Sequence, residues 1–221
     1  MYLKRYFVEG LAQASYLFGA NGEAAIVDPK RDVDDYLVDA EHEGLRIVAI
    51  LNSHPHADFA SGFRELAQRT GAKVYVSHLA PVKYDRVAAK DGDRVQVGSI
   101  EVKLLETPGH SPDSLSFLVR ENGRPEAVFT GDLLFVNDVG RPDLRDADED
   151  PSALAEKLYD SLFHKILALP DDVKIYPAHG SQGLRLAPSA REIRPRRGKR
   201  RRPHPSRECL SGAARNAGPL A

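Results

Sequence analysis

Residues 46–58 read RIVAILNSHPHAD, and this segment predicts both a buried strand and a cluster of polar side chains at its end. The run at 47–51 is continuously apolar, which is typical of a strand buried on both faces. His54, His56 and Asp58 follow within a few residues. A strand end is rigid, and polar side chains there can converge on one point outside the sheet, as metal ligands do. Taken alone, the pattern also fits a turn whose histidines face solvent.

Three more apolar runs end in the same way. His110 lies in TPGHS after IEVKLLE, Asp132 in FTGD after EAVF, and His179 in YPAHG after VKIYP. Each has a glycine neighbour, which lets the backbone turn sharply and approach a metal closely. Because four such strand ends would not converge by accident, the sequence predicts one site that gathers them. The remaining histidines lack this context and suit surface or packing roles: His42, His78, His164 and His204.

Strand-like runs alternate with amphipathic stretches along the chain, which predicts a layered α/β domain. Helices are expected at 32–43, 59–69 and 152–169. In the last of these, leucine or isoleucine recurs every fourth residue, and a proline marks each end. Strands are expected at ASYLFG, AAIVD, RIVAILNS, KVYVS, IEVKLLET, SLSFLV, EAVFTGD and VKIYP.

The composition excludes several classes of protein. With 221 residues, 42% hydrophobic and 29% charged, the chain has the balance of an ordinary globular protein. No apolar run is long enough to span a bilayer, and the start MYLKRYFVEG lacks the layout of a signal peptide, so no membrane partner is expected. The single cysteine, Cys209, excludes an internal disulfide framework and favours a reducing cytoplasm.

Charge is divided unevenly along the chain. Residues 184–221 carry 11 Lys and Arg against 2 Asp and Glu, whereas the residues before them carry 20 basic and 30 acidic groups. An acidic body does not attract phosphate backbones, so nucleic acid is not expected as a partner, except through the tail. The tail lacks apolar periodicity, and its composition is typical of disorder. We therefore divide the chain into a domain at 1–180 and a basic tail at 181–221.

The order of these motifs resembles the metallo-β-lactamase superfamily, an αββα sandwich with its metal site at one edge of the sheets. The resemblance runs from about Leu3 to Gly180. Within the superfamily, HPHADFASG at 54–62 and GDLLFVNDVGRPDL at 131–144 resemble the persulfide dioxygenases, and most closely the branch often fused to rhodanese domains. This resemblance implies an enzyme of sulfide metabolism that oxidises a low-molecular-weight thiol persulfide with O₂ to sulfite.

The resemblance also implies a metal. In persulfide dioxygenases the iron ligands match His54, His110 and Asp132 of this chain. Two histidines and one carboxylate leave open positions on Fe(II) for O₂ and sulfur. Dinuclear hydrolases of the superfamily carry HxHxDH, but Phe59 stands in the last position here, so one Fe(II) per chain is expected. Asp28 in VDP is expected to organise a loop near the site.

Other residues receive roles through the same resemblance. His56, Asp58 and His179 become catalytic residues that orient ligands or hydrogen-bond to bound water, with plain structural support as the alternative. Arg141 is expected near the substrate entrance, where a guanidinium would hold a carboxylate or phosphate of the thiol carrier. The alternative for Arg141 is a pair with Asp143 that pins a long loop.

Alternatives to this function stay open. One is a Zn-dependent thioester hydrolase resembling hydroxyacylglutathione hydrolase, in which the metal lowers the pKa of the attacking water. Another is a catalytically inactive module that binds a sulfur carrier. Glutathione, coenzyme A and bacillithiol persulfides share the reacting atoms, so the carrier is open too. A homodimer and a rhodanese-type sulfurtransferase are the protein partners considered.

The tail departs from the family pattern, which continues after YPAHG with a glycine-rich loop and a closing helix. Here the chain continues SQGLRLAPSAREIRPRRG. Codons for Ser181–Pro188, read in another frame, can encode Ala-Gly-Ser-Ala-Leu-Gly-Ala, which is close to the family loop. We hypothesise that a frameshift near Ser181 replaced the native C-terminus; resequencing the locus and finding this frame intact, with relatives that share the tail, would contradict the hypothesis.

Overall fold

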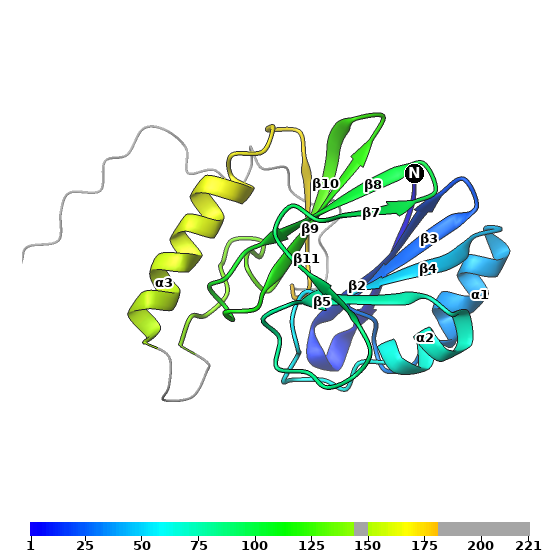
Figure 1. The fold of residues 1–221 in the computed structure, drawn as a ribbon, viewed down its shortest axis with the longest axis horizontal. Coiled ribbons are helices and arrows are strands. Elements are labelled where there is room, and N and C mark those ends of the chain that lie inside the picture. Colours follow the sequence, from blue (N-terminus) through cyan, green and yellow to red (C-terminus); the bar gives the residue numbers. More distant parts are fainter. Residues whose placement is uncertain (144–149, 181–221) are drawn as a thin grey trace, which may run out of the picture.

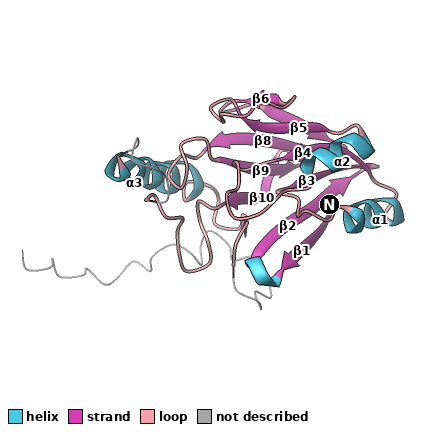
Figure 2. Ribbon diagram, turned by 90° about the horizontal axis from the view of Figure 1, so that it is seen from below, coloured by secondary structure: helices cyan, strands magenta, loops and turns pink. Residues whose placement is uncertain are grey.

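Two β-sheets pack face to face, with helices on their outer faces, in the computed structural model, which describes residues 1–143 and 150–180 (Figure 1). Seen from below, α3 lies on one side of the sheets and α1 and α2 on the other (Figure 2). The expected αββα sandwich is therefore confirmed. The tail at 181–221 lies outside the described residues, so the division of the chain at residue 180 stays a prediction.

The strands of the first sheet lie side by side in chain order, antiparallel from β1 to β3 and parallel from β3 to β6. They are β1 (Tyr2–Val8), β2 (Gln13–Ala20), β3 (Glu23–Val27), β4 (Arg46–Leu51), β5 (Lys73–Ser77) and β6 (Val87–Ala89). The second sheet has the order β11-β10-β9-β8-β7 and is antiparallel apart from the β10–β11 pair. Its strands are β7 (Arg94–Val97), β8 (Ile100–Glu106), β9 (Leu115–Glu121), β10 (Arg124–Gly131) and β11 (Lys174–Pro177).

Aromatic rings fill the space between the sheets. Tyr16 and Phe18 of β2 face inward, and each ring centroid lies 5.1 Å from that of Phe129 on β10. Leu17, between them in sequence, points to the outer face of the same sheet and packs in the layer of α1 and α2. Because β2 is buried on both faces, residues 16–18 are continuously apolar rather than alternating, and the polar Gln13 and Ser15 are buried as well.

Each outer face has its own helical cover. α1 (Asp34–His42) and α2 (Phe63–Thr70) cover the first sheet. α3 (Pro151–Asp160) covers the second, and its chain continues as a π-helical segment, Ser161–Ile166. Two expected helices therefore differ in extent. α2 starts four residues late because 59–62 form the loop beside the site, where Ser61 donates a hydrogen bond to the Pro29 carbonyl (2.8 Å). The helix expected at 152–169 stays α-helical only to Asp160.

The sequence patterns missed strands β1, β6 and β7, and all three lie at sheet edges. Edge strands carry polar residues on their exposed side, which weakens the apolar signal. On β7, for example, Arg94 and Gln96 are exposed while Val95 and Val97 are buried.

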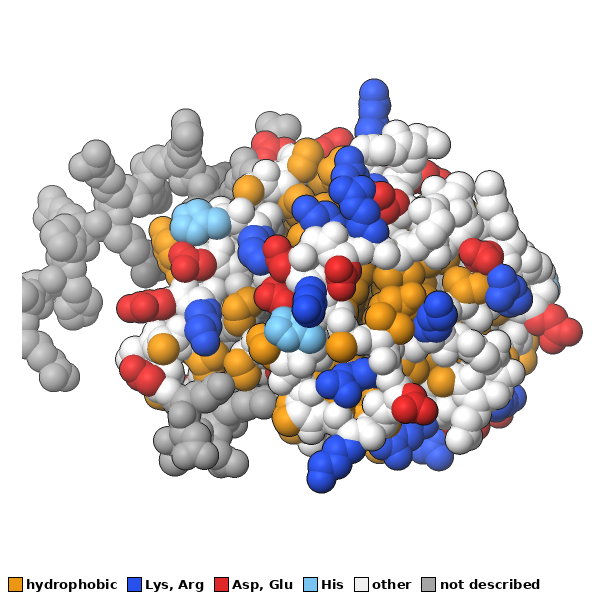
Figure 3. Space-filling view, in the orientation of Figure 1, with side chains coloured by type: hydrophobic (Ala, Val, Ile, Leu, Met, Phe, Trp, Pro, Cys, Tyr) orange, Lys and Arg blue, Asp and Glu red, His pale blue; other side chains and the backbone are white. Residues whose placement is uncertain are grey.

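Within the described ranges, none of the helices has both the length and the apolar character needed to cross a membrane. On the face shown in Figure 3, the coloured Lys and Arg side chains are interspersed with Asp and Glu. On this face, therefore, side chains of the two signs lie close together rather than forming a patch of one sign.

Candidate metal centre

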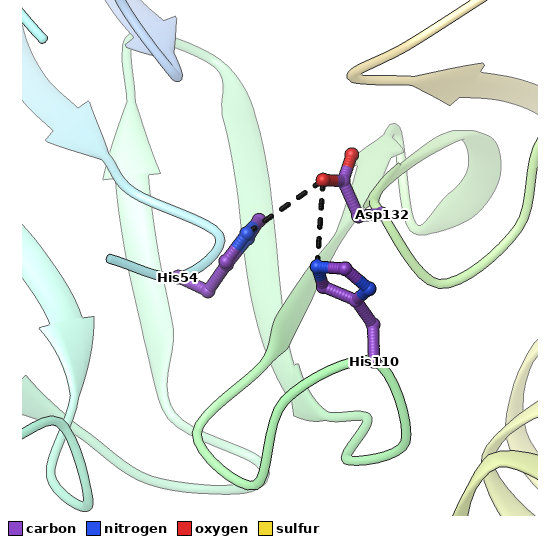
Figure 4. A group of neighbouring side chains, drawn as sticks. All are labelled: His54, His110 and Asp132. Atoms are coloured by element: carbon purple, nitrogen blue, oxygen red, sulfur yellow. Dashed lines mark ion pairs between the residues drawn. The ribbon is translucent and has the colours of Figure 1, made fainter. Parts of the chain in front are cut away.

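His54, His110 and Asp132 come together at one end of the sandwich. His54 follows β4, His110 follows β8, and Asp132 directly follows β10. One ligand atom from each lies within 4.8 Å of the others. The Nε2 atom of each histidine is 3.7 Å from the same oxygen, Oδ2, of Asp132 (Figure 4). We call these three residues the trio; their spacing would let one cation lie between them.

Contacts on the far side of each imidazole ring orient the two histidines. The Nδ1 atom of His54 lies 3.1 Å from the Ser53 hydroxyl, and that of His110 lies 3.2 Å from the backbone carbonyl of Arg141. A carbonyl only accepts, so Nδ1 of His110 is the donor in this contact, and Nε2 is the ring nitrogen that faces the trio. Burial lowers the pKa of His54 to about 3, with neighbouring His56 acting in the same direction, so this ring is neutral as a metal ligand must be.

Asp132 is a buried carboxylate that stays ionised. Burial favours the protonated form, but the hydrogen bond from His179 and the nearby histidine rings outweigh it and lower the pKa of Asp132 to about 2. Its two oxygens have separate tasks. Oδ2 faces the trio, while Oδ1 accepts a hydrogen bond from Nδ1 of His179 (2.6 Å).

His179 bridges two carboxylates instead of joining the trio. Its Nδ1 donates to Asp132 and its Nε2 to Asp58 Oδ2 (2.9 Å). Burial disfavours the charged form of His179, but the Asp132 and Asp58 carboxylates outweigh burial and raise the pKa of His179, because both accept hydrogen bonds from the protonated ring. In a dinuclear site Asp58 and His179 would hold a second metal. In this protein Asp58 and His179 are hydrogen-bonded to each other, and Phe59 offers no ligand atom.

His56 lies behind the trio. Its side chain is buried, with Nε2 3.1 Å from Asp28 Oδ1 and the ring 4.5 Å from that of Phe59. Burial acts to lower the pKa of His56, but the Asp28 carboxylate outweighs it, so the pKa is raised. The same Asp28 oxygen accepts a hydrogen bond from the backbone N–H of Ser53 (2.7 Å), next to His54. Asp28 therefore organises the loop that carries both histidines.

Glycines beside the trio make room for packing neighbours. A Cβ on Gly109 would lie 2.6 Å from the Leu158 backbone of α3, and a Cβ on Gly131 would lie 2.6 Å from the Ser53 side chain. The sequence predicted that glycines let the backbone approach a metal closely. Gly109 and Gly131 do allow a close approach of the backbone, but to the neighbouring residues Leu158 and Ser53 rather than to a metal. The π-helical segment after α3 also fixes the turn before His110, since the Ser161 hydroxyl donates to the Pro108 carbonyl (2.7 Å).

Arg141 reaches the site through its backbone. Its guanidinium is exposed and pairs with both oxygens of Asp143, each at 3.0 Å. This is the loop-pinning pair that the sequence offered as the alternative. The expected contact of Arg141 with substrate stays a prediction.

A cavity of about 240 Å³ lies in front of the trio and is called the metal cavity below. Besides the trio, it is lined by Pro55, Ala57, Asp58 and Ser111. Proline and alanine give it apolar walls, while Asp58 adds one carboxylate.

A family model described as the metallo-beta-lactamase superfamily matches residues 8–179. The chain belongs to this superfamily. Persulfide dioxygenase ETHE1 of Bos taurus is 31% identical over 84% of the chain and 70% of its own length. The hydroxyacylglutathione hydrolase of Francisella tularensis subsp. novicida is 33% identical over 81% of the chain and 68% of its own length. The protein is therefore similar both to a persulfide dioxygenase and to a hydroxyacylglutathione hydrolase of the superfamily.

Solved structures of the superfamily agree with the fold. ETHE1 from Myxococcus xanthus has a TM-score of 0.76 and 33% identity, covering 87% of this chain and 81% of its own. A metallo-beta-lactamase from Staphylococcus aureus subsp. aureus COL has a TM-score of 0.78 and 37% identity over 86% of this chain. The chain spans only 60% of that structure.

The predicted site residues thus fall into separate groups. The trio predicted from the superfamily lies together, and Asp58 and His179 adjoin it through hydrogen bonds. His56 lies outside the lining of the metal cavity. Sequence reasoning missed the Ser53 hydroxyl and the Arg141 carbonyl. Ser53 was visible as the residue before His54, but a backbone carbonyl has no signature in the sequence.

Proposed function

We propose that the protein is a mononuclear Fe(II)-dependent persulfide dioxygenase that oxidises a low-molecular-weight thiol persulfide, such as glutathione persulfide, to sulfite. One observation carries the proposal: two histidines and one ionised carboxylate converge, while His179 is held by Asp58 and Asp132. This donor set, with positions left open, is that of non-haem Fe(II) oxygenases. The similarity to persulfide dioxygenase ETHE1 supports the same reaction.

The residues fit the metal chemically. Imidazole nitrogen and carboxylate oxygen both suit Fe(II), and each histidine has its other nitrogen engaged by a protein group. When bound, iron would supply the redox chemistry and hold sulfur and O₂ as neighbours. The reaction balances when a persulfide, O₂ and water give a thiol, sulfite and two protons, with the terminal sulfur as the electron donor and O₂ as the acceptor.

The chain's own groups orient the reactants and hold protons. Ser53 and the Arg141 carbonyl fix the two rings, and His179 fixes the carboxylate. Asp58 lines the metal cavity and accepts a hydrogen bond from His179. A proton released in the cavity can therefore pass to Asp58, while His179, which donates from both ring nitrogens, keeps that carboxylate in place. We assign Asp58 this proton-holding role, His179 the role of orienting Asp58 and Asp132, and His56 a positioning role behind His54.

Metal content and O₂ uptake test the proposal together. Protein purified without oxygen is expected to contain about one iron per chain and to consume O₂ only when glutathione persulfide is added. Zinc with thioesterase turnover and no O₂ uptake would instead establish the hydrolase, which the similarity to hydroxyacylglutathione hydrolase favours. A folded protein that takes up no metal would establish the inactive module. A cytoplasmic location, a homodimer and a rhodanese partner stay predictions.

Replacing Phe59 with histidine is expected to create a second metal position. The new imidazole would adjoin Asp58, and the added ligand would let His179 exchange its hydrogen bonds for a metal. With zinc supplied in excess, we expect uptake to rise from about one to about two ions per chain, measured by elemental analysis after gel filtration. Phe59→Leu, which keeps the side chain apolar, should stay at the wild-type value. Two ions in the wild-type protein would show that Phe59 does not limit the site.

A further inference from the structure

Gln13 is a fully buried glutamine at the start of β2, and it contacts two separate parts of the candidate metal centre. Its side-chain Nε2 donates a hydrogen bond to the Asp28 backbone carbonyl (2.9 Å). Its backbone forms an isolated antiparallel bridge with His179. The residue therefore joins the segment that follows β3 to the segment that follows β11.

Backbone hydrogen bonds hold this bridge on both sides. The N–H of Ala14 donates to the Ala178 carbonyl (2.6 Å) on one side. On the other side, the N–H of Gly180 donates to the Ala12 carbonyl (3.2 Å). The side chain of Gln13 therefore starts from a fixed point, and its reach is set by paired backbone rather than by a free loop.

Asp28, which this side chain contacts, has a left-handed backbone (φ 46°) that residues other than glycine rarely adopt. Hydrogen bonds hold it at three points. Its N–H donates to the Leu51 carbonyl (3.0 Å), and its Oδ1 accepts from the Ser53 N–H (2.7 Å). Its carbonyl accepts from Gln13. A strained backbone persists only where its surroundings hold it, and Gln13 supplies the contact on the carbonyl side.

The Asp28 carboxylate depends on this backbone conformation. It accepts the N–H of Ser53 and lies 3.1 Å from Nε2 of His56, so a rotation of the Asp28 backbone would move it away from both groups. Ser53 precedes His54, and its hydroxyl lies 3.1 Å from Nδ1 of that ring. The contact made by Gln13 therefore reaches a member of the trio through Asp28 and Ser53.

Packing alone does not account for a glutamine at this position. Its second amide atom, Oε1, has no hydrogen-bond partner among the described residues, and a buried acceptor without a donor lowers the stability of a fold. Methionine, which has a similar length, would remove Oε1 and also the donor to the Asp28 carbonyl. These two changes act on stability in opposite directions, so the main loss would be the support of Asp28.

We propose that Gln13 is a positioning residue of the metal centre. It holds Asp28 in the left-handed conformation, and Asp28 in turn holds Ser53 and, through it, the His54 ring. That these contacts orient a metal ligand rests on the function proposed above, whereas the contacts themselves are present without a metal.

Gln13→Met in the full-length protein tests the proposal, and the first readout is the binding of Co(II), which takes the same nitrogen and oxygen ligands as Fe(II). Titration of the metal-free protein should show about tenfold weaker binding than in the wild type. This is the low end for groups that support a metal ligand, because Gln13 acts one contact further away. The visible absorption bands of bound Co(II) should also shift, since they report the geometry of its ligands.

A second readout needs no metal. The N–H of Ser53, which donates to the Asp28 carboxylate, should exchange with deuterium about tenfold faster in Gln13→Met, measured by NMR on the metal-free protein. The midpoint of urea unfolding should stay close to the wild-type value.

Ile26→Val is the matched control. Ile26 is fully buried on β3, the strand before Asp28, and the substitution deletes one methyl group from the core. It should lower the urea midpoint and leave both the Co(II) affinity and the Ser53 exchange rate unchanged. If Gln13→Met does not fold, Gln13→Asn replaces it, because the shorter side chain withdraws the amide from the Asp28 carbonyl.

The positioning role is overturned if Ser53 exchange stays at the wild-type rate in Gln13→Met, or if Ile26→Val changes both readouts equally. The two proposals fail separately. Wild-type protein that binds Co(II) with an affinity insensitive to Gln13→Met would overturn the positioning role and leave the dioxygenase standing. Wild-type protein that binds no Co(II) would contradict the dioxygenase, while faster Ser53 exchange in Gln13→Met would still support the role of Gln13 in holding this loop.

Discussion

Alanine in place of Gly140 is expected to remove the metal and to lower the free energy of unfolding by about 3 kcal/mol, the cost of severe overpacking. The new Cβ would lie 1.8 Å from the Asp132 carbonyl oxygen and 2.9 Å from the His110 Cβ, so it would push against two members of the trio at once. The Gly140 N–H also donates to the Leu133 carbonyl (3.1 Å), which holds the loop in place. Displacing this loop moves the adjacent Arg141 carbonyl away from His110.

The measurements are iron per chain and the midpoint of urea unfolding. Gly123→Ala is a matched control, because Gly123 has a left-handed backbone (φ 78°) in the β9–β10 turn and a Cβ there meets no atom within 4 Å. That substitution should cost about 1 kcal/mol through backbone strain alone and leave the iron in place. Retention of iron in Gly140→Ala would show that the loop does not position the trio.

The fold was predictable because its central strands leave a strong signal. β4 is buried on both faces, so its apolar run and the polar residues that follow it mark both the strand and its end. β1 and β7 lie at edges and carry exposed polar residues, adjacent in β1 and alternating in β7, so propensity alone did not separate them from loops. The layered arrangement was predictable from the helices, because α1, α2 and α3 each have an apolar stripe that is buried when it packs against a sheet.

The site was predictable in its residue types but not in its pairings. Strand ends followed by histidine or aspartate pointed to the trio, and resemblance to the family supplied the ligand set. The bridge made by His179 joins residues far apart in the chain, Asp58 and Asp132, and only the folded structure brings them within 2.9 Å and 2.6 Å of it. Gln13 shows the same limit, because nothing in QASYLFGA indicates that its amide oxygen lacks a partner.

Asparagine in place of Asp132 is expected to have the largest effect on metal binding. The amide keeps the size of the side chain but removes the ionised carboxylate that faces both histidines, and it weakens the hydrogen bond that His179 donates (2.6 Å). Losing a supporting contact to a ligand already costs 10–100-fold in metal affinity, so losing the carboxylate ligand should cost more than about 100-fold. Iron content and persulfide-dependent O₂ uptake should therefore fall together.

Asp172→Asn, at an exposed carboxylate before β11, should change neither. If Asp132→Asn keeps its iron but loses O₂ uptake, the carboxylate acts on the reactants and the metal is held by other groups. If both are kept, the trio is not the metal centre.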